Sequence, residues 1–242
     1  MKQKTIFIIA FATLMLNVLS SGANIVVSGD YRLDFNENIM LVTPAQDTEY
    51  NLSSYMDYID AASSLMIAKQ MNLTTGVVFH SVTHDLAAYS EETSLSSYYW
   101  AISSLSEIYS MTNNETYKIA MSRAANKMVS LFLDPTYPGF YVNQYSDPEL
   151  LKTKRPGVQA YAYWALDIAE STNTSLDFTT EKESALRCLT DMLYDPVYGG
   201  FHFYTMQNGS LTIPTNFDEV YPNDGKRLDH LCLAAEVLYE IG

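Results

Sequence analysis

Three acidic side chains gather in one predicted loop, where they could do acid–base chemistry. Asp218, Glu219 and Asp224 fall within residues 211–225, just ahead of a helical apolar pattern. Two carboxyl groups in one site can supply an acid and a base or nucleophile, the pair that glycoside cleavage uses. The alternative is that these loop acids are merely solvated. We take the three as candidate catalytic residues.

A fourth candidate, His202, lies in a short alternating segment. Alternation along a strand is expected to place His202 opposite Phe201 and Phe203, off the core face. It would act as a general base only with a partner within hydrogen-bond reach. A solvated strand position is the competing interpretation.

Polar side chains mark the starts of two helical segments. Arg155 and Gln159 open one, and Arg227 and His230 open another. The start of a helix offers amide donors and the positive end of the helix dipole, so polar groups there can orient the hydroxyl groups of a ligand. Salt bridging is the alternative role. We assign all four to substrate binding.

Aromatic residues make up 13% of the chain and include 19 tyrosines. Tyr99, Trp100, Tyr163 and Trp164 lie on helical segments, and Tyr141 follows a glycine turn. Aromatic rings offer large apolar faces, and tyrosine hydroxyls can reach polar groups. Many aromatics in such helices simply fill a core. The five complete the candidate substrate-binding set.

Metal and cofactor sites are not indicated. The spacing of His80 and His84 would suit a metal on a helix, but the apolar residues at 77–82 predict extended chain there. Cys188 and Cys232 are the only cysteines, and they could pair in an oxidising compartment or remain as buried free thiols. We therefore expect no metal and no cofactor.

The first 23 residues have the layout of a secretory signal peptide. Two lysines precede an apolar run over 5–19, and Ser21 and Ala23 suit the small positions before the cut. An uncleaved anchor is the alternative, but the run is short for a membrane span and is interrupted by Asn17. We predict a secreted or extracytoplasmic protein, with an extended segment over 24–48 and no membrane span after cleavage.

The net charge of the chain limits the classes of partner that it can bind. A net charge of −14 repels phosphate backbones, so nucleic acid is excluded as a partner. Five N-x-S/T sequons suit a secreted glycoprotein; they begin at Asn51, Asn72, Asn114, Asn173 and Asn208.

A repeat organises the chain. The segment DPTYPGFYVN at 134–143 returns as DPVYGGFHFY at 195–204, and a fainter copy follows Gly76. The helical segment at 99–102 likewise returns at 163–166. Self-similarity at a spacing of about 60 residues indicates an array of repeated units.

Each repeat is predicted to contain two helices, a glycine turn and a short strand pair. Helices over 50–71, 115–133 and 181–193 should end before the glycine turns, and others should begin near Leu95, Arg155 and Lys226. Pro156 fits the first position of a helix, and the segment 180–183 has the pattern of a capping box. The fold class is therefore all-α, with α-hairpins over 49–242 forming part of an (α/α) toroid and short β-ribbons after the glycines. About six helices are predicted where a six-hairpin toroid has twelve, so we expect one piece of a longer toroid, incomplete at the C-terminus.

The chain resembles the N-acylglucosamine 2-epimerase-like group within the six-hairpin glycosidase-type superfamily. The motif Asp-x-x-x-Gly-Gly-Phe stands at 195–201, and Lys154-Arg155 and Lys226-Arg227 begin the helices that follow such turns. The resemblance covers roughly 90–242 and implies a sugar or glycan at one axial end. It also implies histidines as acid and base in an epimerase, or paired carboxylates in a hydrolase, with His202 in a loop facing the cleft.

Two function classes follow. The first is a carbohydrate-active enzyme, epimerase-like or glycoside-hydrolase-like. The second is a non-catalytic glycan-binding or interaction module on the same scaffold, because one fold hosts many activities. In both, the ribbons and the starts of the inner helices should meet at one end of the array and surround the ligand there.

Overall fold

The computed structural model describes residues 24–28, 31–36, 39–44, 52–80, 93–144, 152–211 and 228–241. Two compact units divide the chain, Met1–Gln70 with Ser81–Ser90, and Met71–His80 with Glu91–Gly242. The predicted signal peptide lies outside the described residues.

The first unit contains a small antiparallel sheet and one helix. Strands β1 (Asn24–Ser28), β2 (Tyr31–Asn36) and β3 (Ile39–Pro44) pair in chain order, and helix α2 (Leu52–Gln70) follows. The register pairs Leu33 with Val42, within runs of β-branched and apolar residues that favour strands. These three strands come in addition to the ribbons that the sequence predicts after the glycine turns.

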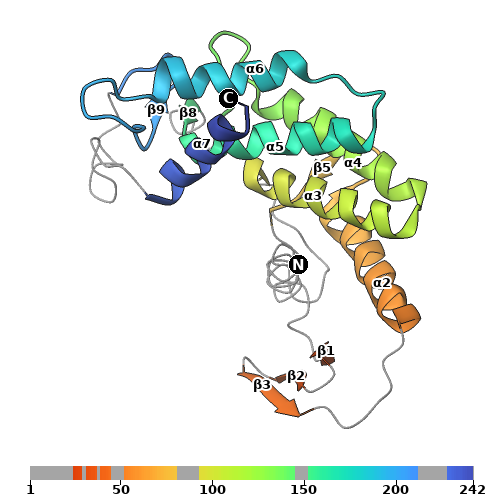
Figure 1. Ribbon diagram of the computed structural model, residues 1–242. Coiled ribbons are helices and arrows are strands. Elements are labelled where there is room, and N and C mark those ends of the chain that lie inside the picture. The colour runs from red at the N-terminus through yellow and green to blue at the C-terminus, as the bar shows by residue number, and fades with distance from the viewer. Residues whose placement is uncertain are drawn as a thin grey trace. The chain divides into compact units, whose positions relative to one another are not determined.

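The second unit has two layers of helices. Its elements are α3 (Leu95–Thr112), α4 (Glu115–Phe132), α5 (Pro156–Thr172), α6 (Thr179–Arg187), the π-helical η2 (Cys188–Leu193) and α7 (Leu228–Ile241). Helix α5 packs between α3 and α7 to form an inner layer, while α4 covers α3 and α6 covers α5 (Figure 1). This alternation is the α-hairpin array that the repeat predicts.

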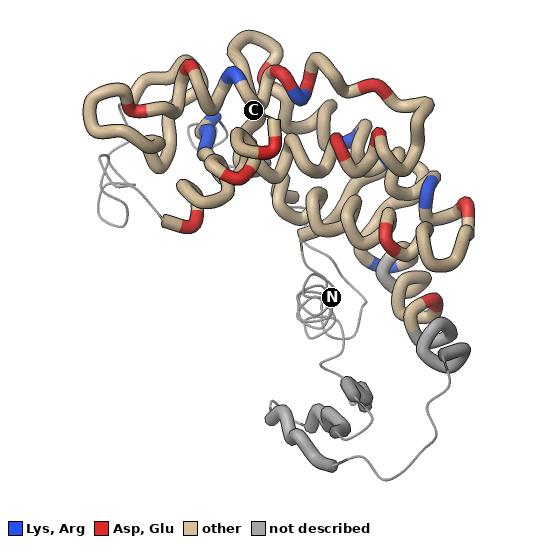
Figure 2. The backbone as a smooth tube through the Cα atoms, viewed as in Figure 1, with Lys and Arg blue, Asp and Glu red and all other residues tan. Residues whose placement is uncertain are grey.

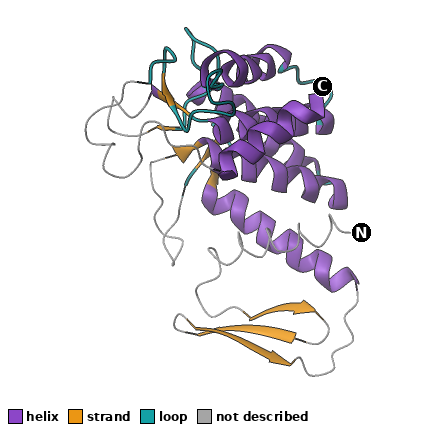
Figure 3. Ribbon diagram, turned by 60° about the vertical axis from the view of Figure 1, so that its left-hand side comes forward, coloured by secondary structure: helices purple, strands orange, loops and turns teal. Residues whose placement is uncertain are grey.

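Short strands join the repeats at one end. β4 (Met71–Asn72) pairs with β5 (Val77–Val78), β6 (Thr93–Ser94) with β7 (Asn143–Gln144), and β8 (Thr153–Lys154) with β9 (Thr205–Met206). In the second unit the strands and the long loops gather at one end of the helices (Figure 3). The predicted ribbons after the three glycines are present, and the starts of α3 and α5 lie beside them.

The repeated ten residues form the same turn twice. Asp134 Oδ1 accepts the amides of Thr136 and Tyr137 at 2.8 and 3.1 Å. Asp195 Oδ1 accepts the two corresponding amides at 2.9 and 3.1 Å. Both Asp side chains close their turns on the backbone, as proline after Asp at a helix end predicts.

Glycine is required at the end of the first turn. Gly139 has φ +100°, in the left-handed region, and a Cβ there would lie 2.5 Å from Cys188 Cβ. Its amide donates to Ser184 Oγ at 2.8 Å. The turn is thereby held against the outer helix of the next repeat.

The helix starts agree with the sequence in one case and differ in another. Pro156 occupies the first turn of α5 as predicted. The capping box expected at 180–183 is wrong, because α6 already begins at Thr179. Asp177 Oδ1 accepts the Thr179 amide at 3.1 Å, so an acid further upstream satisfies the first amide of the helix.

Candidate functional site

Four aromatic rings form one cluster on the inner helices. Tyr99 and Trp100 come from α3, and Tyr161 and Trp164 come from α5. Tyr99 stacks on Tyr161 with ring centroids 4.8 Å apart and lies 4.9 Å from Trp100 and 6.3 Å from Trp164. Trp100 is 40% exposed, so solvent reaches the cluster. We call these four residues the aromatic surface.

Helical geometry decides which α5 rings join this surface. Tyr161 and Trp164 are three residues apart and share a helix face, whereas Tyr163 lies about 200° around from Tyr161. Lys182 Nζ of α6 accordingly lies 5.8 Å from the centre of the Tyr163 ring. Tyr163 therefore lies outside this ring cluster, packed between α6 and α7, and its predicted role in binding stays a prediction. Tyr161 belongs to the cluster, and its spacing from Trp164 was the signal that could have found it.

Acidic side chains of α7 border the aromatic surface. The Trp164 indole Nε1 donates to Glu240 Oε2 at 2.8 Å. Burial raises the pKa of Tyr99, and the charges of Tyr161, Glu236 and Glu240 add to this rise. Burial also raises the pKa of Tyr161, with a further contribution from the Asp229 charge.

His230 lies at the start of α7 against the first turn of α5. Its Nδ1 accepts the Gly157 amide at 3.4 Å, and its ring meets Phe203 edge-on at 5.1 Å. A Cβ at position 157 would lie 3.3 Å from Nδ1, so glycine permits this close approach. The Arg155 guanidinium carbon lies over the same Phe203 ring, 5.0 Å from its centre. Two predicted binding residues, Arg155 and His230, are therefore brought together around one phenylalanine.

Gln159 does not belong to the ligand-binding set. It is fully buried, its Oε1 accepts the Phe140 amide at 2.8 Å, and its Nε2 donates to the Phe140 carbonyl at 2.7 Å. Both polar atoms of the side chain are used to hold the glycine turn. The assignment of Gln159 to substrate binding is corrected for that reason.

Tyr141 belongs to a buried polar cluster. Its hydroxyl accepts from Gln207 Nε2 at 2.8 Å, and Gln207 Nε2 also donates to Asp134 Oδ1 at 3.0 Å. Lys154 Nζ forms an ion pair with Asp134 Oδ2 at 2.7 Å, and both side chains are fully buried. Burial, followed by the hydrogen bond to Asp134, raises the pKa of Tyr141 well above its usual range. We call these four residues the buried lysine cluster, and the structure corrects the role of Tyr141 from ligand contact to turn support.

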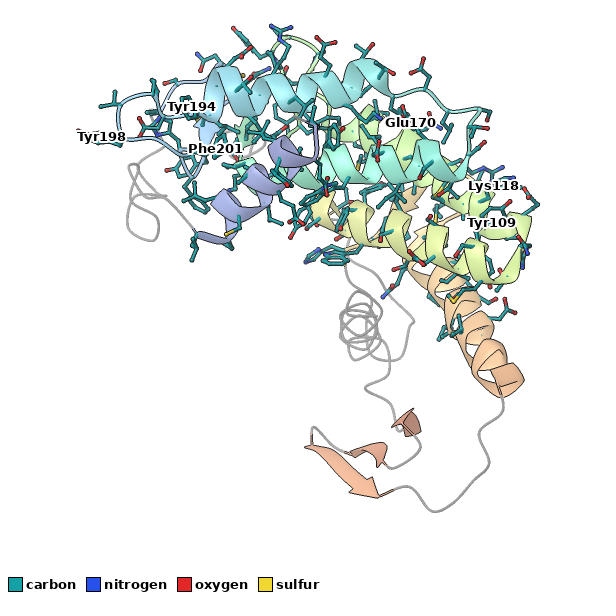
Figure 4. The ribbon with its side chains drawn as sticks, viewed as in Figure 1. Tyr109, Lys118, Glu170, Tyr194, Tyr198 and Phe201 are labelled. Atoms are coloured by element: carbon teal, nitrogen blue, oxygen red, sulfur yellow. The ribbon has the colours of Figure 1, made fainter. Side chains whose placement is uncertain are left out.

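His202 and His80 both lie at the strand end of the helices. Phe201 and Phe203 are buried while His202 is half-buried, as the alternation predicts. His80, which is exposed, places Nδ1 3.1 Å from Ser97 Oγ at the start of α3. Figure 4 shows Phe201 at one end of the helices and Tyr109 at the other.

Some expectations fall on residues outside the described ranges, namely Asp218, Glu219, Asp224 and Arg227. Within the described part of the chain, no group of three or more His, Cys, Asp or Glu residues could hold a metal ion. Cys188 and Cys232 are both free, and Cys232 is exposed rather than buried. No described helix is long and apolar enough to cross a membrane.

Solved structures share this fold. No family profile and no curated protein matches the sequence. A sugar epimerase from a ruminal bacterium superposes with a TM-score of 0.59 at 12% identity, over 78% of this chain and 48% of that one. The cellobiose 2-epimerase of Spirochaeta thermophila DSM 6192 gives 0.58 at 18% identity, over 76% of this chain and 50% of that one.

These comparisons confirm the expected fold class, an all-α array of α-hairpins of the (α/α) toroid type. The chain spans about half the length of the solved structures it matches.

Proposed function

We propose that this protein is a carbohydrate-active protein of the epimerase type that holds a sugar against the aromatic surface. One observation carries the proposal: Tyr99, Trp100, Tyr161 and Trp164 converge from two adjacent inner helices and remain open to solvent at Trp100. Pyranose rings present flat C–H faces, and aromatic side chains bind such faces while their polar edges reach hydroxyl groups. The epimerase fold of the solved structures supports the same assignment.

We propose His230, at the start of the inner helix α7, for proton transfer. Because the Gly157 amide donates to Nδ1, the proton of the neutral ring resides on Nε2. Epimerisation next to a carbonyl needs a proton removed from one face of a carbon and returned to the other. His202, on the ribbon after Gly200, is proposed as the second histidine. The hydrolase alternative depends on Asp218, Glu219 and Asp224 instead.

Tryptophan fluorescence gives a direct test of binding. The chain has two tryptophans, Trp100 and Trp164, and both belong to the aromatic surface. Titration with neutral mono- and disaccharides should change the emission spectrum, with saturation at millimolar concentrations. Tyr161→Ala should weaken binding by about two- to tenfold, the range expected for one aromatic contact.

A control variant separates this effect from a general one. Tyr198 is 87% exposed on the second glycine turn, so Tyr198→Ala should leave the titration unchanged. Equal weakening in both variants, or no spectral change with any sugar, would overturn the binding proposal.

Catalysis has its own measurement. Incubating a bound sugar in D2O and following the C2 proton by NMR detects proton abstraction even without net turnover. Exchange that disappears in His230→Ala supports the epimerase assignment. Binding without exchange would contradict it and favour the non-catalytic glycan-binding module.

Export is part of the same proposal and rests on the first 23 residues alone. N-terminal sequencing of the exported protein should begin near Asn24. An intact Met1 in the exported form would contradict cleavage.

A further inference from the structure

The three inner helices differ sharply in charge from the rest of the unit. Helices α3, α5 and α7 together carry six acidic residues and no Lys or Arg, as their sequences read. Figure 2 shows the acidic positions along α7 with no basic position among them. The basic residues of the described hairpins lie on the outer helices, the strands and the turns.

Two of the six acids are neutralised from the outer layer. Lys182 of α6 pairs with Asp167 at 2.9 Å and with Glu170 at 2.5 Å. This ion pair lies on the side of α5 that faces α6, where the Tyr163 ring also lies. Tyr161 and Trp164 lie on another face of α5.

Glu236 and Glu240 of α7 lie beside the Tyr99 ring, and Glu240 also contacts Trp164. They are four residues apart on α7 and so share a helix face. Glu240 Oε2 accepts a hydrogen bond from the Trp164 indole N–H, and the charges of both carboxylates contribute to the raised pKa of Tyr99. Within the described residues, neither carboxylate forms an ion pair with a Lys or Arg.

Aromatic faces and carboxylates attract the same kind of ligand. An organic cation over a tyrosine or tryptophan ring is held by the ring quadrupole, and it is held more tightly when the cation loses water. A carboxylate a few ångströms away adds a Coulomb attraction of similar size at the surface. A neutral sugar uses the rings but gains nothing from the charges.

We propose that the aromatic surface, bordered by Glu236 and Glu240, binds a positively charged amino sugar in preference to a neutral or N-acylated one. This inference rests on the proposed function, since it names the substrate class of the same site. The ammonium group is placed between the α7 carboxylates and the aromatic rings, while the sugar ring stacks on the aromatic face.

The test compares three ligands of matched ring structure. D-glucosamine, D-glucose and N-acetyl-D-glucosamine are titrated against the full chain near pH 6, with tryptophan emission as the readout. We expect D-glucosamine to bind about five- to tenfold more tightly than the other two, from one cation–π contact and one carboxylate. Raising the salt concentration should reduce this preference, because exposed charges are screened.

Charge-removing variants identify the source of the preference. Glu240→Gln keeps an acceptor for the Trp164 indole, and the double variant Glu236→Gln/Glu240→Gln removes both charges at nearly constant shape. The double variant should bind all three ligands with similar affinity. Glu183→Gln, on the exposed face of α6, is the matched control and should leave the preference intact.

The outcomes separate this inference from the function it rests on. Equal affinity for the three sugars would overturn the inference and leave the sugar-binding proposal standing. Binding of tetramethylammonium with no response to any sugar would overturn the proposed function. A glucosamine preference that survives the double variant would refute the role of Glu236 and Glu240.

Discussion

Replacing Lys154 with methionine should remove much of the stability of the helical unit. The Lys154 ammonium contacts one carboxylate at 2.7 Å and three carbonyl oxygens at 2.7, 3.1 and 3.3 Å, all in a fully buried setting. Methionine fills a similar volume but leaves the Asp134 carboxylate buried without its cation. Breaking a buried pair from one side costs about 3–5 kcal/mol, a large part of the ~5–15 kcal/mol that stabilises a domain.

Urea denaturation followed by circular dichroism measures this loss. The control is Lys118→Met, because Lys118 pairs with Glu115, whose side chain is 58% exposed, and such exposed pairs add little to stability. The double variant Asp134→Asn/Lys154→Met should regain more than half of the loss. Its asparagine oxygen still accepts the two turn amides but carries no charge. A Lys154→Met variant no less stable than the control would refute the reasoning.

The ion pair between Lys154 and Asp134 also predicts how the stability of the helical unit depends on pH in acid. Burial raises the pKa of Asp134, but the Lys154 ammonium and the turn hydrogen bonds outweigh it and hold the pKa below its usual value. A lowered folded-state pKa adds stability that is complete above the unfolded-state pKa of about 3.9 and is lost as pH falls through the folded-state value. Asp134→Asn should therefore flatten the stability profile of the unit below about pH 4. An unchanged profile would contradict this assignment.

Two further predictions concern the glycine turns and the thiols. Gly139→Ala should destabilise the unit by at least about 2 kcal/mol, since it combines a left-handed φ with overpacking against Cys188. The control Gly199→Ala places a Cβ with no atom within 4 Å, so it should cost only the strain of its positive φ. Equal midpoints of the two variants in thermal melts would refute this difference. Alkylation under native conditions should modify Cys232 only, because Cys232 is exposed and Cys188 is buried. Burial also raises the pKa of the Cys188 thiol to about 12. Rapid labelling of both cysteines in the native protein, counted by mass spectrometry, would contradict this prediction.

The architecture was predictable because its signals are local and repeated. The echoed turn at 134–143 and 195–204 fixes the hairpin spacing, and Pro156 marks a helix start that needs no long-range information. Gln159 shows where such reasoning ends, because a polar residue near a helix start suggests ligand binding as readily as burial. Its true partner, Phe140, lies 19 residues away across a turn.

The candidate site was harder to predict for a related reason. The sequence shows that Tyr161 shares a helix face with Trp164, but which face of α5 meets α3 depends on the packing of the neighbouring helices and could not be read from the sequence alone. The burial of Lys154 likewise depends on Gln207, 53 residues downstream. Strands β1–β3 were missed because alternating apolar runs do not reveal whether a partner strand is near.

The pairing of the short strands sets the smallest piece of this array that can fold by itself. Each strand that precedes an inner helix pairs with the ribbon of the following repeat, as β6 does with β7 and β8 does with β9. A chain cut between two hairpins would leave one such strand without a partner and, at Lys154, would remove a carbonyl from a buried ammonium. Each hairpin is therefore joined to the next by a strand pair to which both contribute. A truncated or grafted piece should therefore contain at least two neighbouring hairpins, since stability in such arrays resides in the junctions between units as well as in the units.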